Sequence, residues 1–124
     1  MRLERIHHVS LNVRDVAEAE RFYTEVLGLR PLPRPDFGFP GCWLDAGEQQ
    51  IHLIEQADHS APEGQHFAFE VADLEATIAQ LAQRGAQPSR VFDLPGAGRQ
   101  AFLRDPSGNL IELNQPSKPG PPTD

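Results

Sequence analysis

Both halves of the chain begin with the same alternation of apolar and polar residues. Residues 6–13 alternate strictly, and residues 66–71 repeat the pattern. Alternation with a period of two puts the apolar side chains on one face of a strand and the polar ones on the other. The apolar faces carry Val9, Leu11 and Val13 in the first half, and Phe67, Phe69 and Val71 in the second. We expect these faces to pack on helices and the polar faces to look into a concavity.

A helical pattern follows each of these strands. In the first half Asp15 is the expected N-cap, with Glu18 as its capping-box partner, and apolar residues continue at helical spacing as far as Gly28. In the second half Asp73 is the expected N-cap of a helix that ends at Gly85. One amphipathic helix is therefore predicted in each half.

Further strands are predicted after each helix. Strand-like segments lie at about 42–45 and 50–55, and again at 100–104 and 110–114. The last two are separated by Asp105-Pro-Ser-Gly108, whose residues suit a type I turn.

The second half repeats the first. Residues 8–15 align with 66–73 without a gap, and residues 51–53 align with 111–113. We predict one α+β domain built from two βαβββ modules related by a pseudo-twofold axis, with curved mixed sheets enclosing a cavity and helices outside. The predicted modules span about residues 5–57 and 64–115, and 116–124 form a loose tail.

The duplication places metal-ligand residue types at matched positions. His8 and His66 are equivalent in the first strand of each repeat, and His52 and Glu112 are equivalent in the last. All four fall on the polar face, where three imidazoles and one carboxylate would suit a divalent cation such as zinc, nickel, iron or manganese. A structural or surface role is the alternative for each residue alone.

Other polar-face and loop residues are weaker candidates. Trp43 could line a pocket or belong to the core, and Arg99 could bind an anionic substrate or be solvated, as could Arg104. Glu70 and Asn114 could orient the ligands. The predicted substrate-binding residues are Asn12, Phe37, Phe39, Trp43, Arg99 and Asn114. His7 and His59 are predicted to be structural or solvated.

Composition restricts the partners. The 124 residues carry a formal net charge of −7, and no lysine or arginine cluster suits a nucleic-acid backbone. No run approaches the length needed to cross a membrane, and no apolar signal segment is evident at the N-terminus. The single cysteine, Cys42, is predicted to be a small buried apolar residue in a cytoplasmic protein.

These motifs resemble the vicinal oxygen chelate superfamily, which includes glyoxalase I, fosfomycin-resistance transferases, extradiol dioxygenases and bleomycin-resistance proteins. The matching segments are 8–16, 21–29, 66–71 and 102–112. The resemblance implies a divalent metal held by His8, His66 and Glu112, with the fourth position at His52. It also implies a homodimer with sites at the interface, and a metal that chelates two vicinal substrate oxygens.

Departures from the named members narrow the function. Glyoxalase I usually has glutamate where His52 stands, so this histidine could ligate or act as a base. Asn12 replaces an arginine that helps to hold glutathione in bacterial glyoxalase I. Phe102 replaces a tyrosine of the extradiol dioxygenase signature, which disfavours catechol cleavage.

Three functions follow as expectations. The first is a glyoxalase-like lyase or isomerase acting on a small oxygenated metabolite, with His52 and Glu112 as catalytic residues. The second is a thiol transferase or a binding protein that confers antibiotic resistance, and the third is a dioxygenase-type member.

Overall fold

The computed structural model describes residues 1–117. Most of the predicted tail, residues 118–124, lies outside the described residues. The chain divides into two compact units. The first unit is Met1–Gln65 together with Arg104–Asn109, and the second is His66–Leu103 together with the segment that begins at Leu110.

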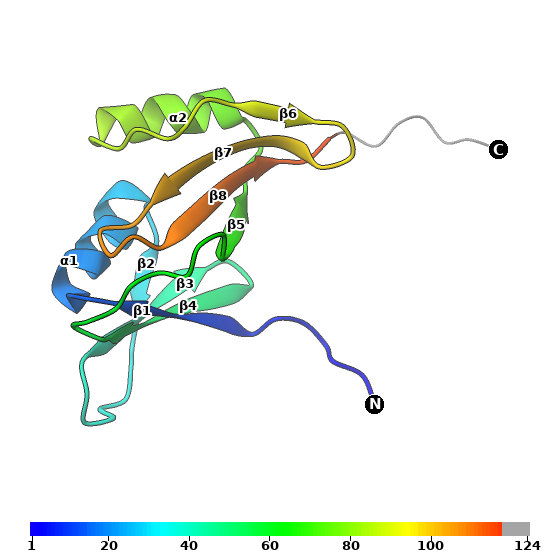
Figure 1. Ribbon diagram of the computed structural model, residues 1–124. Coiled ribbons are helices and arrows are strands. Elements are labelled where there is room, and N and C mark those ends of the chain that lie inside the picture. The colour runs from blue at the N-terminus through cyan, green and yellow to red at the C-terminus, as the bar shows by residue number, and fades with distance from the viewer. Residues whose placement is uncertain (118–124) are drawn as a thin grey trace. The chain divides into compact units, whose positions relative to one another are not determined.

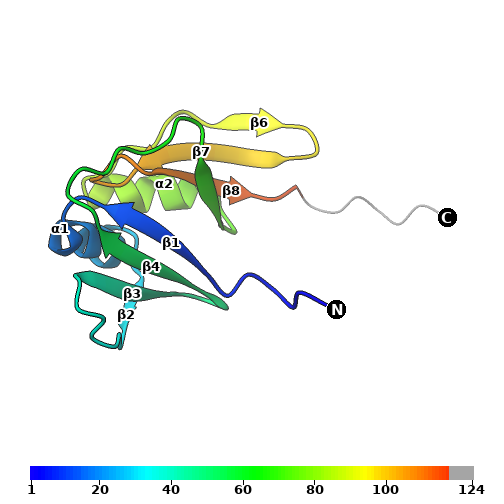
Figure 2. The same cartoon turned by 60° about the horizontal axis from the view of Figure 1, so that its bottom comes forward.

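The first unit contains one four-stranded sheet and one helical segment (Figures 1 and 2). Its strands lie in the order β1-β4-β3-β2, with β1 parallel to β4 and the other pairs antiparallel. The elements in chain order are β1 His8–Val13, α1 Val16–Arg21, η1 Phe22–Val26, β2 Arg30–Leu32, β3 Gly41–Ala46 and β4 Gln49–Glu55.

The second unit repeats this order. Its sheet runs β5-β8-β7-β6, with β5 parallel to β8 and β6 antiparallel to β7. The predicted α+β class with two βαβββ repeats is thereby confirmed. The elements in chain order are β5 His66–Glu70, α2 Leu74–Gln83, β6 Phe92–Leu94, β7 Gly98–Arg104 and β8 Leu110–Gln115.

Both helices begin where the sequence predicts. The Asp15 side chain accepts a hydrogen bond from the Glu18 backbone N–H at 3.0 Å, and Asp73 accepts one from Ala76 at 3.0 Å. The first helix does not continue as a regular α-helix to its end, because residues 22–26 form a π-turn in which Leu27 N–H donates to the Phe22 carbonyl.

Two short edge strands, β2 and β6, were not predicted by alternation. Each has three residues, too few for a period of two to be evident. Pro31 lies within β2, where an edge position tolerates the missing N–H.

The predicted turn at residues 105–108 forms and belongs to the first unit. The Gly108 N–H donates to the Asp105 carbonyl at 3.0 Å. The buried Asp105 carboxylate accepts the Tyr23 hydroxyl at 2.8 Å and two bonds from Asn109. Because charged hydrogen bonds inside a protein are strong, this cluster holds the turn against the helical segment.

The predicted apolar faces of β1 and β5 are only partly buried, because Val9, Leu11, Phe67, Phe69 and Val71 are half-buried. Val13, Leu53 and Ile111 are almost fully buried. Cys42 is buried and free, and burial raises the pKa of its thiol to about 12, so it is not a thiolate nucleophile near neutral pH. Within residues 1–117, no helix is long and apolar enough to cross a membrane.

Candidate functional site

The second unit brings two of the predicted ligands together. His66 opens β5 and Glu112 lies on β8, where its backbone pairs with Ala68. The His66 Nε2 and Glu112 Oε1 atoms are 3.1 Å apart. The Glu112 side chain is 9% exposed and the His66 side chain is 37% exposed, so a buried carboxylate is paired with a more accessible imidazole.

Asn114 fixes the other carboxylate oxygen. Its Nδ2 donates to Glu112 Oε2 at 2.8 Å and to the Ala97 carbonyl at 3.0 Å. The Glu112 carboxylate is therefore held from both sides, by an amide and by an imidazole. This arrangement orients a potential metal ligand, as partners of ligating carboxylates do.

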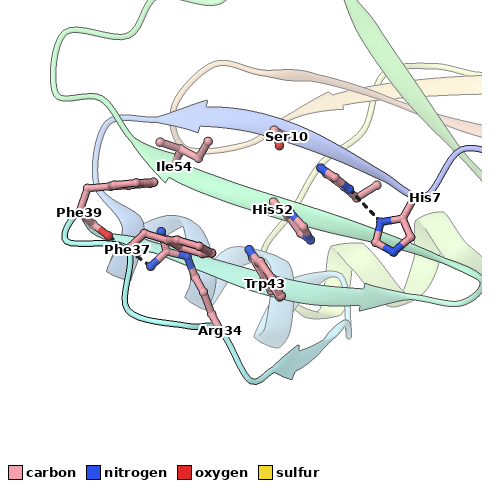
Figure 3. A pocket seen from close by; sticks show the side chains of 9 residues that line it. His7, Ser10, Arg34, Phe37, Phe39, Trp43, His52 and Ile54 are labelled. Atoms are coloured by element: carbon pink, nitrogen blue, oxygen red, sulfur yellow. Dashed lines mark hydrogen bonds between the residues drawn. The ribbon is translucent and has the colours of Figure 1, made fainter.

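The first unit arranges the equivalent pair differently. The His8 and His52 rings are stacked, with centroids 4.0 Å apart and planes inclined by 16°. The Trp43 ring stacks on His52 at 4.3 Å and 8°. The three rings come from the adjacent strands β1, β4 and β3, as Figure 3 shows for His52 and Trp43.

This stack limits what His8 and His52 can bind together. A ring-nitrogen lone pair lies in the plane of its imidazole, so a shared cation must lie near both planes. Two nearly parallel planes at this separation have no common point close to their nitrogens. Shared ligation of one cation by both histidines would therefore require one ring to rotate out of the stack.

His52 is buried and has its own partner. It is 8% exposed, and its Nε2 lies 2.8 Å from Gln50 Oε1. Burial lowers the pKa of His52 from its ordinary value of 6.5, and the neighbouring His8 lowers the pKa further. A neutral imidazole at neutral pH can accept a proton or ligate a metal.

A pocket of about 340 Å³ opens over this face of the first unit (Figure 3). Its lining combines the ring stack with loop residues that precede β3. Arg34 lies over the rings of Phe37 and Phe39, with its guanidinium carbon 4.9 and 5.0 Å from their centroids. The lining is completed by Trp43, His52, His8, His7, Ser10 and Ile54.

Three of the predicted substrate-binding residues line this pocket, namely Phe37, Phe39 and Trp43. The other predicted residues have different surroundings. Asn12 is exposed, and its backbone carbonyl accepts a hydrogen bond from Asn109. Arg99 pairs with Glu75 on α2, and both of its terminal nitrogens contact that carboxylate.

The sequence did not indicate Arg34 or His7 as pocket residues, whereas Ser10 lies on the polar face of the first strand, which is expected to look into a concavity. His7 is predicted to be structural or solvated, but β1 begins only at His8, so the alternation of the strand does not extend to His7. Its Nδ1 lies 2.9 Å from Nδ1 of His8. The aromatic residues around Arg34 were the available signal, because guanidinium groups stack on aromatic faces.

His59 behaves as predicted for a structural residue. Its Nε2 lies 2.8 Å from Asn109 Oδ1, and its carbonyl accepts from Arg14. Neither unit alone gathers three or more His, Cys, Asp or Glu side chains into a group that could hold a metal, as far as residues 1–117 are concerned.

Comparison with known proteins identifies the family. The model of the Glyoxalase/Bleomycin resistance protein/Dioxygenase superfamily matches residues 5–113. The chain therefore belongs to this superfamily, as its motifs predicted.

Two curated relatives illustrate the range of the family. Glyoxylase I 4 of Arabidopsis thaliana is 30% identical, over 91% of this chain and 71% of that protein. Metallothiol transferase FosB of Shouchella clausii is 27% identical, over 88% of this chain and 78% of that protein.

Solved structures agree with the fold. A glyoxalase family protein of Bacillus anthracis has a TM-score of 0.84 and 27% identity, and the match covers 94% of this chain and 100% of that chain. TnmS3, an antibiotic binding protein from Streptomyces sp. CB03234, has a TM-score of 0.81 and 28% identity, covering 94% and 99%. FosX of Listeria monocytogenes, in a complex with Mn(II) and a dihydroxypropylphosphonic acid, has a TM-score of 0.80 at 14% identity over 94% and 95%, which shows the fold alone.

Proposed function

We propose that this protein is a divalent-metal-dependent enzyme of glyoxalase type, a lyase or isomerase acting on a small oxygenated metabolite. The observation that carries the proposal is the buried Glu112 carboxylate, held by Asn114 and 3.1 Å from His66. A carboxylate and an imidazole oriented in this way are the donor types that zinc, nickel, iron and manganese accept.

In this proposal His8, His66 and Glu112 hold the cation, and His52 has a separate role. The stacked geometry of His8 and His52 supports one ligand from that pair. His8 is the more exposed of the two, whereas His52 is buried and paired with Gln50. A fourth ligand at His52 is the alternative, and the variants below separate the two.

The metal and His52 would have different roles in the reaction. Bound metal would polarise vicinal substrate oxygens and stabilise negative charge that develops on them. His52, neutral because burial lowers its pKa, would accept a proton from the substrate. When its Nε2–H donates to Gln50 Oε1, its Nδ1 carries the lone pair that takes this proton.

The ligands come from both repeats, and the protein would act in a reducing cytoplasm as a homodimer that completes each site. Light scattering on the purified protein tests the dimer. A monomer that retains metal would remove the dimer from the proposal without removing the metal.

Metal analysis of protein purified without an affinity tag tests the centre. We expect about one metal per site in the wild type, and loss of metal in His8→Ala, His66→Ala and Glu112→Ala. We expect His52→Ala to retain metal and to lose turnover. Retention of metal by Glu112→Ala, or a wild type that binds none of the four metals when they are added, would refute the proposal.

A second candidate, a ligand-binding protein without catalysis, is favoured by the apolar character of the pocket and by the likeness to TnmS3. A third, transfer of a thiol to an electrophilic antibiotic, is favoured by the likeness to FosB. Consumption of an electrophile only when thiol is added would indicate the transferase. Tight binding without product would indicate the binding protein.

A further inference from the structure

We propose that the first unit's pocket takes a planar aromatic or conjugated carboxylate, with the flat part of the molecule against Trp43 and Phe37 and the carboxylate on Arg34. This inference adds a class of substrate to the proposed function. It rests on the proposed function only in assuming that this pocket holds the substrate. The chemistry of the lining residues supports each part.

The apolar part of the lining is aromatic and open. Phe37 and Phe39 are 50% and 46% exposed, and their rings stack 5.9 Å apart at 23°. The Trp43 ring lies 6.0 Å from Phe37. Large apolar side chains that stay exposed in one cluster mark a binding surface, and π-faces favour a flat partner over a bulky aliphatic one.

Arg34 supplies the charge. Among the described residues that line the pocket, Arg34 is the only one with a permanent charge, and none carries a carboxylate. Across residues 1–117, Arg34 forms no ion pair with a carboxylate. A pocket lined by one permanent cation and no carboxylate selects for an anion, and a guanidinium binds a carboxylate through two parallel hydrogen bonds.

The guanidinium is held in place before a ligand binds. Its Nη1 donates to the Phe39 carbonyl at 3.2 Å, and it lies over both phenylalanine rings. Gly41 leaves it room, because a Cβ at this position would lie 2.9 Å from the guanidinium carbon and 2.5 Å from the Leu53 carbonyl oxygen. A preorganised cation loses little conformational entropy when it pairs with a ligand.

The volume of the pocket limits the size of the ligand. About 340 Å³ is at the lower end of ligand pockets, which suits a molecule of one or two rings. A large polyanion or a long peptide would not be enclosed.

Isothermal titration calorimetry with three probes tests the inference. The probes are 2-naphthoate, the neutral 2-naphthamide of the same shape, and the anionic but non-planar cyclohexanecarboxylate. We expect naphthoate to bind at least about tenfold more tightly than either of the other two, because only it satisfies both the rings and Arg34. Equal binding of naphthoate and naphthamide, or no binding of naphthoate, would overturn the inference.

Two variants and a control sharpen the result. Arg34→Gln should weaken naphthoate about tenfold and leave naphthamide unchanged, whereas Phe37→Leu should weaken both. Arg30→Gln is the matched control, because Arg30 is an exposed arginine of β2 that pairs with Asp45 and does not line the pocket. If Arg30→Gln weakens naphthoate binding as much as Arg34→Gln does, the result would count against a specific site at Arg34.

The same titrations in protein stripped with EDTA separate this inference from the proposed function. We expect naphthoate to bind without metal, because Arg34 rather than a cation holds the carboxylate. Binding that needs added Mn(II) and is unaffected by Arg34→Gln would overturn the inference while supporting the metal centre. Binding that is retained in a protein that takes up no metal would leave the inference standing and refute the proposed function.

Discussion

The two pairs of predicted ligands share a backbone register and differ in their side-chain chemistry. In the first unit Ser10 pairs with His52, and in the second Ala68 pairs with Glu112, which is the same register after duplication. The first strand of each sheet opens with the other histidine of its pair. Even so, His8 and His52 stack, whereas His66 and Glu112 form a hydrogen bond.

The difference lies in the last strand of each unit, which carries His52 in one and Glu112 in the other. Trp43 on β3 stacks on His52, and burial lowers the pKa of that imidazole. In the second unit a carboxylate occupies the equivalent position of the last strand, and Asn114 orients it. The repeat thus gives the two pairs equivalent backbone positions, but the first pair lines a pocket and the second is joined by a hydrogen bond.

The turns before the two last strands show the same divergence. Each begins with an aspartate whose Oδ1 accepts a backbone N–H two residues on, from Gly47 in one turn and Ser107 in the other. Asp45 lies near the surface with Arg30, whereas Asp105 is 4% exposed and accepts the Tyr23 hydroxyl.

The largest predicted effect follows from this contrast. Asp105→Asn removes the charge and puts an amide N–H₂ where Tyr23 or Asn109 now donates, so we expect a loss of about 3 kcal/mol in the free energy of unfolding. Asp45→Asn is the matched control and should change it by less than about 0.5 kcal/mol, as exposed ion pairs contribute little. Urea denaturation measures both, and equal losses would show that burial of Asp105 does not set its contribution.

A smaller effect distinguishes the side chains that orient the two pairs. Asn114→Leu leaves Glu112 Oε2 without its amide donor, so we expect Mn(II) affinity to fall about tenfold, as it does when the partners of metal ligands are removed. Gln50→Leu removes the partner of His52 and should change the affinity by less than about threefold if His52 is not a ligand. Titration calorimetry with Mn(II) gives both values, and the reverse order would make His52 the better-supported ligand.

The sequence predicted the repeated fold because its signals are local. Asp15 and Asp73 cap their helices through hydrogen bonds within three residues, and Asp105 to Gly108 closes its turn in the same way. Alternation along β1 and β5 predicted which side chains face the core. The edge strand at Arg30–Leu32 escaped prediction because its pairing with β3, not its own pattern, makes it a strand.

The site was predictable only in part, for the same reason. Position in the repeat identified the residue types at 8, 52, 66 and 112, but stacking against Trp43 is a contact across strands that no local pattern encodes. Arg34 was missed because its place over Phe37 and Phe39 depends on the fold of the loop and on the space at Gly41.

The smallest predicted effect concerns pH and tests whether the His52 environment differs as described. Its pKa is lowered on folding from about 6.5, so below that pH the unfolded chain takes up a proton that the folded protein still excludes. The contribution of neutral His52 to the free energy of unfolding is therefore fully present above a pH of about 6.5. It is lost as the pH falls toward the lowered pKa of His52. His52→Phe keeps a ring in the stack and removes the titration, so in EDTA it should lose less stability than the wild type between about pH 7.5 and 5.5. Urea midpoints at the two pH values measure this difference, and equal losses in the two proteins would show that folding does not lower the pKa of His52.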